Sequence, residues 1–101
     1  MKQFMKVAST NELSPGQCKV AQAGAKTVAL YNVEGKLYAL DNTCLHRGGP
    51  LGEGSITGTV VTCPWHGWQY DVTNGKCMAN PSMAVATFSL KVEGDSIMVE
   101  V

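Results

Sequence analysis

The chain has few of the features that mark several large classes of protein. It contains one arginine, Arg47, and its eight basic and eight acidic residues cancel to a formal net charge of zero. This balance predicts no basic surface large enough to hold a nucleic-acid backbone. No stretch approaches 18 uncharged apolar residues, and Lys2 and Lys6 interrupt the apolar residues at the N-terminus. We therefore expect a soluble, cytoplasmic protein that binds neither nucleic acid nor a membrane.

Length and composition favour one folded domain. Hydrophobic residues make up 45% and charged residues 16% of the 101 residues, which is typical of a globular protein and unlike a disordered one. A chain this short leaves little room for a second core. We expect residues 1–101 to form a single domain.

Short apolar runs bounded by Gly, Asn, Asp and Pro predict an all-β fold. Three turn sequences, around Gly35, Gly75 and Gly94, are typical of tight turns between strands. The predicted strands are Phe4 to Ala8, Gln17 to Gln22, Lys26 to Val33, Lys36 to Asp41, Thr59 to Thr62, Gln69 to Val72, Val85 to Val92 and Ile97 to Val101. The predicted core residues are Val28, Leu30, Leu37, Tyr38, Leu40, Phe88, Leu90, Ile97, Val99 and Val101.

Two segments do not fit this strand pattern. Residues Asn42 to Gly58 are rich in glycine, and we expect a shaped loop there without strand or helix. A second loop, Cys63 to Trp68, follows a predicted strand.

Each loop contains one cysteine and one histidine. Cys44 and His46 form a C-x-H pair, Cys63 and His66 form a C-x-x-H pair, and these are the only histidines in the chain. Two such pairs can converge on one metal centre, and thiolate and imidazole ligands suit zinc or iron–sulfur chemistry. Structural zinc more often uses C-x(2–4)-C knuckles followed by paired histidines. The mixed pairs therefore favour iron–sulfur but leave zinc open.

The two motifs closely resemble those of the Rieske iron–sulfur family, in which two cysteines hold one iron and two histidines hold the other. The resemblance covers the four ligands, the Gly-Gly-Pro-Leu after the first pair and the Cys-Pro-Trp-His-Gly-Trp of the second loop. It implies one [2Fe-2S] cluster per chain, held by Cys44, His46, Cys63 and His66. It also implies a Rieske-like antiparallel β-sandwich with a cluster-binding subdomain of two loops, about 42–54 and 63–70.

The sequence departs from the respiratory branch of that family. Gly49 and Trp65 stand where respiratory members carry cysteines joined as a disulfide, and Trp68 replaces a serine that hydrogen-bonds the cluster. Tyr70 matches a family tyrosine that can donate to a cysteine sulfur. Fewer donors imply a potential toward the low end of the Rieske range. The remaining cysteines, Cys18 and Cys77, are expected to be small buried side chains, with a disulfide between them as the alternative.

No other catalytic constellation can be assembled from the sequence, so we expect an electron-transfer component and not an enzyme. The resemblance implies a ferredoxin that passes electrons from a flavin-dependent reductase to a terminal oxygenase. A small Rieske subunit of an assimilatory nitrite reductase is one alternative, with a terminal reductase as acceptor. A zinc-bound structural or binding module is an alternative of another class.

Overall fold

The computed structural model describes residues 3–43, 50–65 and 67–100 of the chain. Its regular structure is almost entirely strand, which confirms the predicted all-β fold. In chain order the elements are β1 (Phe4–Ser9), the 3₁₀ turn η1 (Thr10–Glu12), β2 (Cys18–Ala23), β3 (Lys26–Val33), β4 (Lys36–Asp41), the 3₁₀ turn η2 (Leu51–Glu53), β5 (Ser55–Thr57), β6 (Val60–Thr62), β7 (Gln69–Asp71), β8 (Thr87–Phe88), β9 (Leu90–Glu93) and β10 (Ser96–Glu100).

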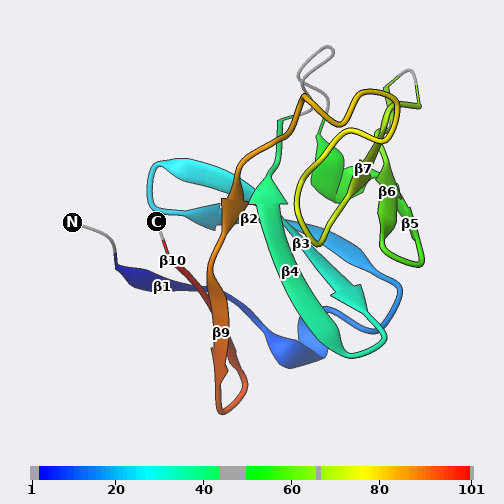
Figure 1. The fold of residues 1–101 in the computed structure, drawn as a ribbon. Coiled ribbons are helices and arrows are strands. Elements are labelled where there is room, and N and C mark those ends of the chain that lie inside the picture. Colours follow the sequence, from blue (N-terminus) through cyan, green and yellow to red (C-terminus); the bar gives the residue numbers. More distant parts are fainter. Residues whose placement is uncertain (1–2, 44–49, 66, 101) are drawn as a thin grey trace.

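The strands form three antiparallel sheets (Figure 1). The central sheet has the order β2-β3-β4-β8, and the sheet β1-β10-β9 joins the two ends of the chain. We call these two sheets the frame. The third sheet, β5-β6-β7, together with the loops that flank it, is called the loop subdomain. Most strands pair with a neighbour in sequence, as the turn sequences predicted.

Two clusters of buried side chains lie on the two faces of the central sheet. The frame core consists of Ala8, Leu13, Ala21, Ala23, Val28, Leu30, Ala39, Ile97 and Val99. The site core consists of Ala29, Tyr31, Leu40, Leu51, Val61, Cys63, Tyr70, Val72, Cys77 and Val85. Along β3, Val28 and Leu30 belong to the frame core, whereas Ala29 and Tyr31 belong to the site core. Because both faces of this strand are covered, its middle is an uninterrupted run of buried residues.

Half of the predicted core residues are fully buried. Val28, Leu30, Leu40, Ile97 and Val99 have essentially no exposed surface. Four others are only partly buried and pack against one of the two cores: Leu37, Tyr38, Phe88 and Leu90. Val101 lies outside the described residues.

The prediction of one strand from Val85 to Val92 was wrong. The segment contains two strands, because Thr87–Phe88 pairs with β4 whereas Leu90–Glu93 pairs with β10 of the other frame sheet. Ser89 lies between them, where the chain passes from one sheet to the other. Alternating apolar residues indicate a strand but do not identify its partner. The point at which the chain passes from one sheet to the other could therefore not be predicted from the pattern.

The prediction of a loop without strand or helix from Asn42 to Gly58 was also wrong. Leu51–Glu53 forms η2 and Ser55–Thr57 forms β5. β5 pairs with β6 through Ser55 to Thr62, Ile56 to Val61 and Thr57 to Val60. The strand is three residues long and lies between glycines, so its local sequence resembles a loop.

The turn between β3 and β4 confirms a predicted hairpin. Glu34 and Gly35 both have positive φ, 53° and 93°, which matches a type I′ turn. The side chain of Asn32 supports the turn, because its Oδ1 accepts from the Gly35 N–H at 2.8 Å and its Nδ2 donates to the Leu13 carbonyl at 2.9 Å.

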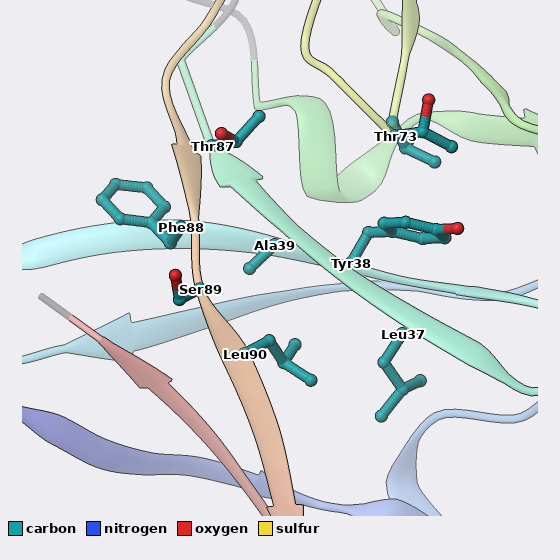
Figure 2. Close-up of a pocket in the computed structure, with 9 residues that line it drawn as sticks. Leu37, Tyr38, Ala39, Thr73, Thr87, Phe88, Ser89 and Leu90 are labelled. Carbon is teal, nitrogen blue, oxygen red and sulfur yellow. The ribbon is translucent and has the colours of Figure 1, made fainter.

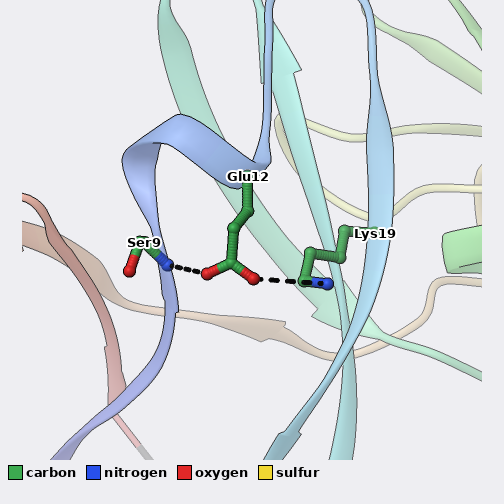
Figure 3. A network of polar contacts seen from close by, with 3 residues as sticks. All are labelled: Ser9, Glu12 and Lys19. Carbon is green, nitrogen blue, oxygen red and sulfur yellow. Dashed lines mark hydrogen bonds and ion pairs between the residues drawn. The ribbon is translucent and has the colours of Figure 1, made fainter.

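A smaller polar contact links β1 to β2 through η1 (Figure 3). The Ser9 N–H donates to Glu12 Oε2 at 2.7 Å, and Lys19 Nζ lies 3.7 Å from Glu12 Oε1. The three side chains are at least partly open to solvent.

Among the described residues, no helix has the length and apolar character needed to cross a membrane.

Candidate metal centre

The base of the first predicted loop is closed by contacts between its two ends. Thr43 and Pro50 form an antiparallel bridge, and the Leu51 N–H donates to the Asn42 carbonyl at 2.8 Å. The Asn42 side chain adds a second contact, in which Oδ1 accepts from the Gly52 N–H at 2.7 Å. The residues on the two sides of the first loop are therefore direct neighbours.

Two glycines let the returning segment approach its neighbours closely. A Cβ at Gly52 would lie 2.7 Å from Val20 Cγ2 and 3.0 Å from the Lys19 carbonyl oxygen. A Cβ at Gly54 would overlap the carbonyl oxygen of Thr62. Thr62 directly precedes Cys63, so the contact at Gly54 holds the first loop against the strand that leads into the second.

The second loop is closed around Cys63. The Cys63 N–H donates to the Trp68 carbonyl at 2.7 Å, which brings the two ends of the loop together. Inside the loop, the Trp65 N–H is directed at Cys63 Sγ with an N···S distance of 3.4 Å. A backbone N–H donor stabilises negative charge on a sulfur, and a thiolate is the form that binds metals.

Cys63 is the one predicted ligand that the structure describes. Its side chain is 2% exposed and belongs to the site core with Leu51, which follows the first loop. The flanks of the two loops therefore meet in one buried cluster. The other three predicted ligands, Cys44, His46 and His66, lie outside the described residues.

The aromatic residues of the second loop differ in exposure. Trp65 is 50% exposed, whereas Trp68 is partly buried and packs against the site core. Tyr70 is fully buried in the site core. The proposed hydrogen bond from Tyr70 to a cysteine sulfur stays a prediction.

Cys18 and Cys77 are free thiols, so the alternative of a disulfide between them is wrong for this structure. Cys77 is 1% exposed and lies in the site core. Cys18 is half-buried and packs against the same core. Burial raises the pKa of the Cys18 thiol to about 11, which keeps it neutral and poorly reactive.

Two polar residues near the loops were missed by the sequence analysis. Asn42 closes the base of the first loop through its side chain. Tyr31 lies on a central strand of the frame, yet its side chain is in the site core with Cys63. The one signal for Tyr31 was a phenol in an otherwise apolar buried run, since an interior hydroxyl normally needs a partner.

A surface hollow lies apart from these loops (Figure 2). Leu37 and Tyr38 of β4 line one side, Phe88 and Ser89 line another, and Thr73 of the loop subdomain closes the end. None of its lining residues is a predicted ligand.

Comparison with known families identifies the chain. A model of the Rieske [2Fe-2S] domain matches residues 3–89. The chain belongs to the Rieske family. Because members of this family bind a [2Fe-2S] cluster, the cofactor is that cluster and not zinc.

Relatives of this Rieske chain are ferredoxin components. It is 32% identical to the ferredoxin component of the naphthalene 1,2-dioxygenase system from Pseudomonas aeruginosa, with 88% of this chain and 86% of the relative covered. It is 33% identical to the ferredoxin component of biphenyl 2,3-dioxygenase from Rhodococcus jostii strain RHA1, with 94% and 90% covered. The prediction of an electron carrier, as opposed to an enzyme, is confirmed.

Solved structures agree with this fold. The ferredoxin of carbazole 1,9a-dioxygenase from Nocardioides aromaticivorans IC177 has a TM-score of 0.88 at 26% identity, with 96% of each chain covered. A chain from a complex of reduced oxygenase and oxidised ferredoxin in carbazole 1,9a-dioxygenase has a TM-score of 0.84 at 30% identity, covering 95% of this chain and 91% of that one. A putative NADH-dependent nitrite reductase small subunit from Mycobacterium tuberculosis has a TM-score of 0.90 at 19% identity, covering 100% of this chain and 96% of that one, and this likeness shows the fold alone.

The described part of the site suits the cluster. Cys63 offers a buried sulfur with a backbone N–H directed at it, and the surrounding site core is mostly apolar. Such surroundings exclude water from the thiolate side of an iron–sulfur site and tune its redox behaviour.

Proposed function

We propose that this chain is a soluble, cytoplasmic one-electron carrier that accepts electrons from a flavin-dependent reductase and passes them to a terminal oxygenase. The observation that carries the proposal is the match in length as well as sequence. Ferredoxin components of oxygenase systems at about one-third identity are covered over 86% and 90% of their length. In contrast, the chain covers only 29% of a terminal oxygenase of the same fold family.

The proposed ligands are Cys44, His46, Cys63 and His66, within one domain of residues 1–101. Support comes from the family's mixed cysteine and histidine ligation and from the buried position of Cys63. When bound, the cluster takes up and releases a single electron. The chain holds the cysteine side of the site in an apolar core and leaves the half-exposed Trp65 at the surface of the second loop.

The proposed potential lies toward the low end of the Rieske range, which runs from about −150 to +300 mV. Trp68 supports this proposal, because its indole packs against the site core and offers no hydroxyl to the cluster. Fewer hydrogen bonds to the sulfurs stabilise added electron density less.

Electron paramagnetic resonance of the dithionite-reduced protein tests the cluster and its ligands. We expect a signal whose average g lies below that of all-cysteine [2Fe-2S] clusters in the parent protein. The signal is expected to disappear in Cys63→Ser and in His66→Ala, and to change in His46→Cys. Colourless, fully metallated protein without a signal would contradict the proposal and favour the zinc module.

Cys77→Ser is the matched control for Cys63→Ser. Both cysteines are buried in the site core, with exposures of 1% and 2%, but only Cys63 belongs to the motif. We expect Cys77→Ser to keep the signal and the iron content of the parent. Equal loss in both variants would indicate that the site core, and not ligation, is the cause.

Electron delivery distinguishes the proposed partner from a nitrite reductase. In rapid mixing, the reduced protein is expected to be oxidised by the oxygenase component of a naphthalene or biphenyl dioxygenase system. It is expected to be reduced by the flavin reductase of the same system with NADH. Failure of both transfers by protein with a full Rieske signal would leave the electron carrier in place and overturn the assigned partners.

A further inference from the structure

Tyr31 places a hydroxyl group inside the site core. The residue has no exposed surface, and its hydroxyl has no hydrogen-bond partner within the described part of the chain. A buried polar group without a partner is costly, and such groups are rare in folded proteins. The position therefore suggests a partner that the protein chain itself does not supply.

The backbone of Tyr31 is held firmly on both sides. β3 lies between β2 and β4, and Tyr31 is directly opposite Cys18 on one neighbour and Tyr38 on the other. The Tyr31 side chain lies on the face that Ala29 also presents to the site core. Its hydroxyl is consequently placed by a central strand and not by a loop.

Tyr31 has one cysteine, Cys18, opposite it in the sheet and shares the site core with a second, Cys63. Burial raises the pKa of the Tyr31 phenol above its usual range, and the negative charges that Cys18 and Cys63 would carry raise it further. The phenol is thus protonated at physiological pH and available as a donor. Cys18 is a poor acceptor, since its own thiol stays neutral, whereas a metal-bound cysteine or sulfide carries negative charge.

We propose that the Tyr31 hydroxyl donates a hydrogen bond to a sulfur of the iron–sulfur site on its Cys63 side and thereby raises the reduction potential. The proposal rests on the assignment of Cys63 as a ligand. Reduction adds negative charge to the cluster sulfurs, so a donor binds the reduced form more strongly than the oxidised form. Tyr31 thus belongs to the frame but acts directly on a site whose ligands lie in the loops.

The test is the midpoint potential of holoprotein carrying Tyr31→Phe, with Tyr38→Phe as the matched control. Tyr38 loses the same hydroxyl from the neighbouring strand, where its ring is only partly buried. We expect Tyr31→Phe to lower the equilibrium constant for reduction threefold to tenfold, a tenfold change being about 59 mV for one electron. We expect Tyr38→Phe to have the same potential as the parent.

Resonance Raman spectroscopy in D₂O adds a second readout. When a sulfur accepts a hydrogen bond from an O–H group, exchange for deuterium shifts the iron–sulfur stretching frequency, and Tyr31→Phe should lose that shift.

The proposal is overturned if Tyr31→Phe has the same potential and the same deuterium shift as the parent. If that variant still gives a Rieske signal, the ligand assignment stands. Absence of a Rieske signal in the parent would instead overturn the ligand assignment and this inference with it. Repeating Tyr31→Phe in a Cys18→Ala background shows which sulfur is involved. If the change in potential vanishes in that background, Tyr31 acts through Cys18 and not through the iron–sulfur site.

If Tyr31→Phe does not retain the cluster, 3-fluorotyrosine at position 31 strengthens the hydrogen bond instead of removing it. Its more acidic phenol is a stronger donor and should raise the potential, and an unchanged value would overturn the proposal.

Discussion

The two faces of the central sheet differ in the chemistry of their side chains. The frame core contains only aliphatic residues, nine in number from Ala8 to Val99. The site core contains two tyrosines, Tyr31 and Tyr70, and two cysteines, Cys63 and Cys77. One sheet therefore separates an entirely aliphatic cluster from a cluster that also contains hydroxyl and thiol groups. Successive residues of β3 face the two clusters, so that Leu30 packs in the frame core and Tyr31 packs in the site core with Cys63.

The largest expected effects come from removing one leucine from each core. Leu30 and Leu51 both have no exposed surface, and Leu→Ala in such positions costs about 2–5 kcal/mol of unfolding free energy. Leu51 follows the first loop and shares a cluster with Cys63, so Leu51→Ala is expected also to shorten the lifetime of the cluster. Denaturant unfolding by circular dichroism, beside visible absorbance of the cluster, measures the two quantities.

In Leu30→Ala, by contrast, the absorbance of the cluster should disappear only with the fold. If Leu30→Ala and Leu51→Ala are equally stable and lose the cluster equally fast, the site core has no special role in holding the cluster.

A smaller effect is expected from adding a methyl group at Gly54, where the first loop lies directly against Thr62. A methyl group at Gly54 would overlap the Thr62 carbonyl oxygen, a backbone atom that cannot rotate away. Gly54→Ala should cost about 1–3 kcal/mol and reduce the iron bound per chain. Gly58→Ala is the control, because Gly58 has a φ of +60° but no atom near its missing Cβ. Gly58→Ala strains a turn of the same subdomain and should leave the iron content unchanged, and a matching loss there would contradict the role of the close contact.

Much of the frame could be predicted from local sequence. The bounds Lys26–Val33 and Lys36–Asp41 were correct because a type I′ turn at Glu34 and Gly35 joins two clear apolar runs. The errors arose where the partner of a strand decides its structure. Ser55–Thr57 becomes a strand through pairing with β6, and Thr87 to Glu93 divides because its two halves pair with different sheets.

The candidate site shows the same division. The four proposed ligands could be named from the sequence because each cysteine and histidine pair lies within one loop, and Cys63 is the one whose surroundings the structure describes. Tyr31 and Asn42 could not, because both act on segments that are distant in sequence. Tyr31 packs in the site core with Cys63 of a distant loop, and Asn42 accepts a hydrogen bond from Gly52, ten residues away.

The Asn42 contact allows a substitution confined to one hydrogen bond. Asn42→Ala removes the acceptor of the Gly52 N–H at 2.7 Å and leaves that buried donor unpaired, at a cost of about 1–2 kcal/mol. Asn42→Asp keeps an acceptor at the same position and should lose less than half as much. Thermal unfolding followed by circular dichroism measures both variants. A larger loss in Asn42→Asp than in Asn42→Ala would contradict the assigned hydrogen bond.

The smallest effect is expected far from the metal centre, at Glu12 of the frame (Figure 3). The hydrogen bond from the Ser9 N–H, aided by Lys19, lowers the pKa of this carboxyl although desolvation opposes the change. A carboxyl with a lowered folded-state pKa contributes stability above its unfolded pKa and loses it as the pH falls through the folded value. Glu12→Gln should therefore be slightly less stable than the parent at neutral pH, and the two denaturation curves should converge in acid. Lys19→Met should produce a smaller difference, because it leaves the stronger Ser9 contact intact. A gap that widens in acid would reverse the sign and exclude this carboxylate as a stabilising group of the frame.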